Sequence, residues 1–98
     1  MDIYIEKENE EISFQEWLDY VESDEELFLE EVAEAINPLT KAKLRVEIPG
    51  RVIYHGMEIR FRRGRIGSED GSEEMLAKLK EIAIVFGANV YDCGEEID

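Results

Sequence analysis

The side chains that most often carry out chemistry in proteins are scarce in this chain. It contains one histidine, His55, and one cysteine, Cys93. His55 lies between Tyr54 and Gly56, in a sequence typical of a turn, where a lone histidine is more often a surface residue than a general base. Cys93 follows Asp92, and this anionic neighbour opposes formation of the reactive thiolate. We therefore expect neither residue to be catalytic.

Other patterns that support catalysis or cofactor binding are also missing from the sequence. The 25 acidic residues are too numerous for spacing to pick out an acid and base pair. No phosphate-binding glycine loop, zinc pattern, calcium loop or nucleophile elbow is present, and one cysteine with one histidine gives no metal-ligand spacing. We predict a protein that is not an enzyme and that uses no metal and no cofactor.

Charge is the most distinctive property of the chain, because a basic segment interrupts an acidic protein. The formal net charge is −14 over 98 residues. Between residues 41 and 65, however, eight basic residues face two acidic ones, which leaves a charge of plus six. An acidic excess raises solubility and speeds encounter with basic partners, whereas nucleic-acid binders usually carry a net positive charge. The composition therefore favours a protein partner over nucleic acid.

An acidic segment near the first expected helix provides the first candidate binding surface. Its carboxylates would meet a cationic partner, and an exposed aromatic side chain would serve as an anchor. A simpler interpretation is a solvated surface, to which the sequence gives about equal weight. The candidate residues are Asp19, Tyr20, Glu22, Asp24, Glu25, Glu26, Phe28, Glu30 and Glu31.

A second candidate surface follows from the alternation of strands in the basic segment. If Leu44, Val46, Ile59 and Phe61 point to the core, the basic residues between them point away and form a positive stripe on the open sheet face. Arginine forks on such a stripe suit phosphates or carboxylates; cross-strand pairing with this chain's own glutamates is the alternative. The stripe would contain Lys43, Arg45, Arg60, Arg62 and Arg65.

Two amphipathic helices are expected. Ser13 and Glu16 form a capping box, and Ile12 with Trp17 forms a hydrophobic staple, so the first helix begins at Ser13. The second is expected over residues 73–86, with Asp70 or Ser72 as its cap and Gly87 in the left-handed position after it.

Alternating apolar residues predict strands over 2–7, 42–48, 51–54, 57–61 and 89–93, and residues 94–98 read as an acidic tail that frays. Residues 24–36 are ambiguous between helix and strand, since Ser23 and Glu26 form another capping box. We favour a strand near 30–36 that turns at 37–40 and pairs with 42–48.

These elements define the expected fold class. Two helices with one apolar stripe each cover one face of an antiparallel sheet, which gives an α+β two-layer sandwich in a single domain, residues 1–98. The sequence has no leader peptide and no membrane span, so a cytoplasmic protein is expected. The oligomeric state, the binding face and the source organism stay open.

The chain resembles the small acidic bacterial immunity proteins that protect cells from polymorphic or contact-delivered toxins. The resemblance rests on size, acidity and layout, and on the segments ISFQEWLDYV at residues 12–21, INPLT at 36–40 and NVYDCG at 89–94. It implies a cytoplasmic protein that binds one toxin domain, often a basic nuclease, and occludes it. It implies no catalytic residue and transfers no interface. The alternative is a module that binds nucleic acid or phosphate through the basic sheet face.

Overall fold

An antiparallel sheet runs through the body of the protein. In a computed structural model, which describes residues 1–97, seven strands form this sheet in the order β2-β5-β6-β7-β1-β8-β9. The strands are β1 (Ile3–Glu6), β2 (Leu27–Leu29), β5 (Val52–Tyr54), β6 (Met57–Arg62), β7 (Arg65–Ser68), β8 (Asn89–Asp92) and β9 (Glu95–Ile97). Strand β1 pairs with β7 on one side and β8 on the other, so the first strand of the chain lies inside the sheet.

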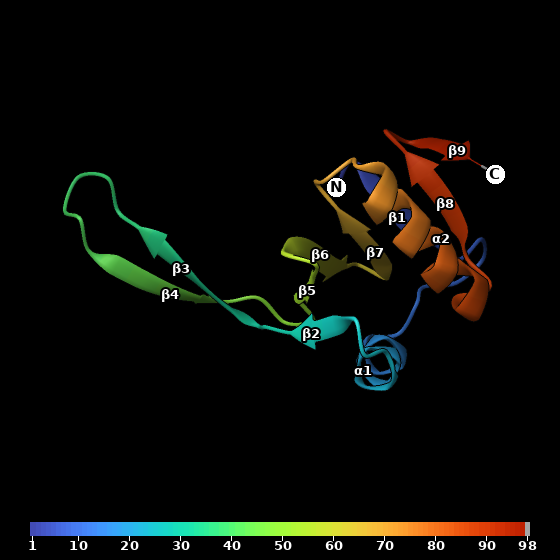
Figure 1. The fold of residues 1–98 in the computed structure, drawn as a ribbon, viewed down its shortest axis with the longest axis horizontal. Coiled ribbons are helices and arrows are strands. Elements are labelled where there is room, and N and C mark those ends of the chain that lie inside the picture. The colour runs from blue at the N-terminus through green and yellow to red at the C-terminus, as the bar shows by residue number, and fades with distance from the viewer. Residues whose placement is uncertain (98) are drawn as a thin grey trace.

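Both helices, α1 (Phe14–Ser23) and α2 (Glu73–Phe86), pack on one face of this sheet (Figure 1). Trp17 from α1 and Leu79 from α2 are fully buried in one core with sheet residues such as Ile5, Ile59 and Ile66. The predicted α+β sandwich of two layers is therefore confirmed. No helix within the described residues is long and apolar enough to span a membrane.

The predicted helix boundaries are confirmed by the hydrogen bonds at the helix ends. The Ser13 hydroxyl accepts from the Glu16 N–H at 3.1 Å, and the Glu16 carboxylate accepts from the Ser13 N–H at 2.9 Å. Ser72, not Asp70, caps α2 by accepting from the Met75 N–H at 3.1 Å. Gly87 adopts φ +64° after the last turn, as its position predicted.

The ambiguous segment forms strands, not a helix. After β2, the chain enters β3 (Val32–Ile36), which pairs antiparallel with β4 (Lys43–Glu47). The turn between them is closed by Asn37, whose side-chain oxygen accepts from the Leu39 N–H at 2.9 Å. The favoured hairpin is thus confirmed, whereas the short strand β2 before it was not predicted separately.

The hairpin of β3 and β4, residues 32–47, projects from the body as an arm (Figure 1). Its two strands pair only with each other among the described residues, and the molecule measures 45 × 27 × 25 Å. The expectation that Leu44 and Val46 point to the core is wrong: they are 55% and 43% exposed. The helices cover only the body, so no helix layer reaches the arm.

The C-terminal segment also differs from the prediction. Instead of fraying, residues 95–97 form β9, which pairs with β8 from Val90 to Asp92. Cys93 and Gly94 both adopt positive φ angles, +51° and +86°, which suits a tight two-residue hairpin turn. Asp98, the last residue of the predicted tail, lies outside the described residues.

Candidate functional site

A groove of about 720 Å³ lies between α1 and the edge strand β2. Apolar side chains form its floor, and carboxylates stand around its rim. Phe28 and Leu29 are the most accessible apolar residues in it, with exposed fractions of 65% and 47%. The lining residues are Gln15, Leu18, Asp19, Val21, Glu22, Asp24, Glu25, Leu27, Phe28 and Leu29.

The groove forms because α1 packs against only part of β2. Trp17 fixes the helix to the body, since its indole N–H donates to the Gly50 carbonyl at 2.8 Å. Leu27 then points into the core opposite Tyr54, while Phe28 points to the other face opposite Ile53. Leu29 points to the same face of the sheet as Leu27, but it lies at the end of the strand, where it is 47% exposed.

The turn between α1 and β2 is held by a buried ion cluster around Lys78. The Lys78 side chain is only 2% exposed, and its ammonium donates to Asp24 at 2.8 Å, Glu26 at 2.9 Å and Glu81 at 2.7 Å. It also lies 5.3 Å from the centre of the Tyr54 ring. Asp24 accepts from the Glu26 N–H at 3.0 Å, which ties the turn to the same cluster.

The cluster shifts the pKa values of its members. Burial alone lowers the pKa of Lys78, but the hydrogen bonds that its ammonium donates to three carboxylates outweigh burial and hold the pKa above its ordinary value. Burial raises the pKa of Asp24, and hydrogen bonds to Lys78, the Glu26 N–H and Tyr20 more than reverse this, so the net pKa is lowered. At neutral pH Lys78 is therefore protonated and Asp24 is deprotonated, and the ion pair between them stabilises the fold.

The predicted acidic surface therefore divides into structural and available residues. Asp24 and Glu26 bind Lys78, the Glu30 carboxylate lies 3.6 Å from Arg51, and Glu31 accepts from the Gly50 N–H at 2.9 Å. Asp19 accepts only from Gln15, and Glu22 and Glu25 make no side-chain hydrogen bond or ion pair within residues 1–97. These last three carboxylates remain available at the groove.

Of the two aromatic anchors expected, Phe28 is exposed and Tyr20 is partly buried. The Tyr20 ring stacks on Trp17 at 6.3 Å between centroids and contacts Phe86 at 5.6 Å. Its hydroxyl donates to Asp24 at 2.8 Å, and burial with this carboxylate raises its pKa. Tyr20 is a packing residue, because its position on α1 faces the second helix.

The predicted basic stripe is split between two parts of the molecule. Arg60, Arg62 and Arg65 share the open face of the main sheet, but Lys43 and Arg45 lie on the arm. Arg60 is paired with Glu58 at 2.6 Å and Arg65 with Glu6 at 2.7 Å. The expectation of one continuous stripe fails because β4 does not join the main sheet.

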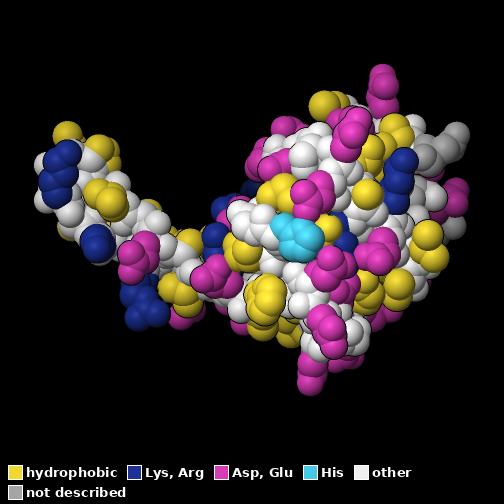
Figure 2. Space-filling model, in the orientation of Figure 1, with side chains coloured by type: hydrophobic (Ala, Val, Ile, Leu, Met, Phe, Trp, Pro, Cys, Tyr) yellow, Lys and Arg dark blue, Asp and Glu magenta, His cyan; other side chains and the backbone are white. Residues whose placement is uncertain are grey.

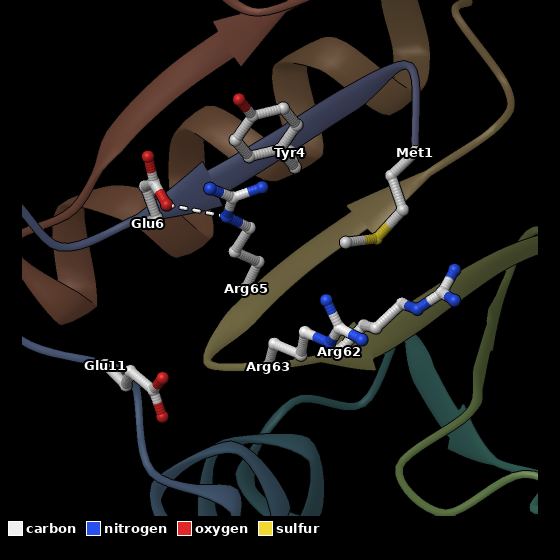
Figure 3. Close-up of a pocket in the computed structure, with 7 residues that line it drawn as sticks. All are labelled: Met1, Tyr4, Glu6, Glu11, Arg62, Arg63 and Arg65. Atoms are coloured by element: carbon white, nitrogen blue, oxygen red, sulfur yellow. Dashed lines mark hydrogen bonds and ion pairs between the residues drawn. The ribbon is translucent and has the colours of Figure 1, made fainter.

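A hollow of about 500 Å³ occupies the open sheet face beside these arginines (Figure 3). Arg65 lies 4.9 Å from the centre of the Tyr4 ring, which in turn stacks on Tyr91. Arg62 and Arg63 also line the hollow, and neither forms an ion pair in the described part of the chain. Glu6 and Glu11 line it too, so its own carboxylates offset most of the positive charge.

His55 and Cys93 lie apart from both surfaces. The His55 ring stacks on Tyr54 at 4.2 Å and is flanked by Glu26, at 3.4 Å, and Glu74. Hydrogen bonding to Asp92 raises the pKa of the exposed Cys93 thiol, the effect expected from the sequence. Among residues 1–97, no group of acidic, histidine and cysteine side chains has the geometry to hold a metal ion.

Sequence reasoning missed the Lys78 cluster and the groove floor. Both had a signal: Lys78 stands three residues after Met75 and four before Ile82, inside the apolar stripe of its helix. The compact run Leu27-Phe28-Leu29 likewise indicated more apolar surface than one strand face can bury.

The fold and the groove define a small α+β protein with a projecting arm and an acidic, partly apolar surface groove. No protein-family model, no curated protein and no solved structure matches the chain.

Proposed function

We propose that the protein is a stoichiometric inhibitor, of the kind found among bacterial immunity proteins, that acts in the cytoplasm by covering a basic toxin domain. The groove beside α1 is its binding surface in this proposal. Phe28 and Leu29 supply apolar anchors, and Asp19, Glu22 and Glu25 supply the charge that attracts a cationic partner. Inhibition follows from occlusion and requires no reaction by this chain.

The single observation that carries the proposal is the exposed Phe28 ring beside carboxylates that the fold does not use. A large aromatic side chain on an edge strand stabilises nothing while it is in water, whereas it contributes strongly once a partner covers it. Unpaired carboxylates around such an anchor mainly raise the association rate and select partners by charge. Together these features suit a basic protein better than a small molecule.

The first test is whether the source genome encodes a toxin C-terminal domain next to this chain, and such a domain is then used as the binding partner. Its association with the protein is measured by surface plasmon resonance over a range of salt concentrations. Reversal of the three groove carboxylates, Asp19→Lys, Glu22→Lys and Glu25→Lys, should slow association about tenfold or more at low salt and flatten its salt dependence. Phe28→Ala should instead speed dissociation, because it removes the anchor and leaves the charge.

A matched control reverses three acidic residues outside the groove. Glu8→Lys, Glu95→Lys and Glu96→Lys change the net charge by the same amount at exposed positions. Equal effects of the two triple variants would refute the groove as the binding surface. Salt-sensitive binding of a labelled oligonucleotide, with no binding of the toxin domain, would favour the nucleic-acid alternative.

A further inference from the structure

The arm carries an uncovered apolar face. In the register of the hairpin, Ala33 lies opposite Val46 and Ala35 opposite Leu44, so these four side chains share one face. Val32, Glu34 and Ile36 lie on the other face, opposite Glu47, Arg45 and Lys43. A two-stranded hairpin with nothing packed on it is marginally stable in water. The apolar face of the arm therefore requires a cover that the body does not provide.

The base of the arm is firmly attached to the body. The Glu30 N–H donates to the Arg51 carbonyl at 2.9 Å, and the Ile48 N–H donates to the Glu31 carbonyl at 2.7 Å. The Arg51 guanidinium pairs with the Glu58 carboxylate and donates to the Glu30 carbonyl at 3.1 Å. The arm is thus held in a fixed direction, which lowers the entropy cost of docking it.

Charge distinguishes the tip of the arm from the rest of the molecule. The end of the arm, residues 35–44, contains Lys41 and Lys43 and no acidic residue, whereas Arg45 lies opposite Glu34. The body, by contrast, carries the acidic excess, and carboxylates are spread over the face of it that Figure 2 shows. The groove with Glu22 and Glu25 borders β2, the strand that precedes the arm. Each molecule thus has a cationic tip at one end of the arm and an anionic groove near the other.

We propose that a second copy of this chain covers the apolar face of the arm. The two arms lie antiparallel across a two-fold axis, with their apolar faces of Ala33, Ala35, Leu44 and Val46 packed against each other. In this arrangement the cationic tip of each copy reaches the acidic groove at the base of the other. A two-fold interface uses the same patch on both molecules, and the arm with its groove is self-complementary in both apolar surface and charge.

A second copy fits these features better than the basic partner of the proposed function. A basic toxin would be repelled by the tip of the arm, whereas the acidic body of another copy attracts it. The hairpin also presents Ala33 and Ala35 on one strand and Leu44 and Val46 on the other, so an identical hairpin laid antiparallel can set its large side chains against the small ones. The inference goes beyond inhibition and does not require it, since it concerns the protein alone.

The first experiment measures the mass of the wild-type protein by sedimentation equilibrium. A dimer is expected at roughly 100 µM protein and about 0.15 M salt, because salt at this concentration screens the repulsion between two copies of net charge −14 and leaves the packing of the apolar faces intact. A protein that stays monomeric under these conditions would overturn the proposal.

Matched substitutions on the two faces of the hairpin test the packing. Leu44→Thr with Val46→Thr should raise the dimer dissociation constant about tenfold or more, since threonine keeps the strand propensity and loses apolar surface. Val32→Thr with Ile36→Thr makes the same type of change on the opposite face and should leave the constant within about twofold. Equal effects of the two pairs would contradict packing through the face of Leu44 and Val46.

Charge exchange between two variants tests the placement of the tip. Lys41→Glu with Lys43→Glu reverses the tip, and Glu22→Lys with Glu25→Lys reverses the groove. Each variant alone should be monomeric, and an equimolar mixture should form a heterodimer whose total charge equals that of the wild-type pair. A mixture that stays monomeric would refute the contact between tip and groove, and none of these measurements involves the toxin.

Discussion

Replacing Lys78 with methionine removes a buried ammonium that three carboxylates share. Methionine keeps most of the apolar part of the side chain, and it loses the ammonium that lies 5.3 Å from the centre of the Tyr54 ring. Asp24, whose side chain is only 12% exposed, is left with an unpaired charge, while Glu26 and Glu81 are about half exposed and turn to water. We expect the fold to survive at neutral pH with reduced stability.

The solvent exposure of the three carboxylates determines how much free energy of unfolding Lys78→Met loses. Removing one partner of a fully buried pair costs about 3–5 kcal/mol, and exposed pairs contribute about 0–1 kcal/mol. Since only Asp24 is largely buried, we expect Lys78→Met to lower the free energy of unfolding by about 2–3 kcal/mol. Adding Asp24→Asn removes the unpaired charge and should recover at least about half of this loss.

The pH dependence of Lys78→Met has a definite sign. In the wild type the pKa of Asp24 is lowered, so its contribution to stability is present above about pH 4 and is lost as pH falls through the folded pKa. Without Lys78 the pKa of Asp24 is higher than in the wild type, because a hydrogen bond and a positive charge that lower it are lost, and protonation then relieves the unpaired charge. The stability deficit of the variant should therefore shrink as pH falls from 7 towards 4.

Urea unfolding measured by tryptophan fluorescence is a direct assay, because Trp17 is the only tryptophan and is fully buried. A deficit below about 1 kcal/mol, or one that stays constant with pH, would refute a stabilising role for the cluster. Failure of Asp24→Asn to restore stability would show that the loss comes from packing rather than charge.

Two further predictions concern local structure and use the same assay. Ser13→Ala removes the capping box of α1 and should cost about 1 kcal/mol; an unchanged midpoint would show that the cap adds nothing beyond packing. Gly64→Ala should cost at least about 2 kcal/mol, because φ is +74° and the new methyl group would overlap the Glu11 side chain. Gly56→Ala is its control, since φ is +80° but no atom lies within 4 Å, and it should cost only about 1 kcal/mol.

The sequence predicted those parts of the fold that local chemistry determines. Ser13 with Glu16, Ser72 and Gly87 set the helix ends through contacts within a few residues, and Asn37 set the turn of the arm in the same way. The two layers followed from one apolar stripe per helix. These features depend on spacing along the chain, so no knowledge of distant partners was needed.

The candidate sites were harder to predict because they depend on which elements meet. Alternation in β4 showed that Leu44 and Val46 share a face, but not that this face lies outside the body. Lys78 is 54 residues from Asp24, and only the packing of α2 beside the turn between α1 and β2 brings them together. That contact converts Asp24 and Glu26 from binding residues into structural ones and leaves Asp19, Glu22 and Glu25 available.

The two proposals use one groove, and this has a consequence for how inhibition responds to concentration. If the tip of a second copy occupies the groove, a toxin must displace it, so the apparent association constant for the toxin is the intrinsic constant multiplied by the fraction of grooves that are free. Added salt weakens both the contact with the tip and the attraction of a basic toxin. Weakening the arm alone, with Leu44→Thr and Val46→Thr, frees the groove without changing its charge. Tighter binding of the toxin by this variant than by the wild type therefore follows from competition for the groove, and weaker binding would mean that the arm itself contacts the toxin.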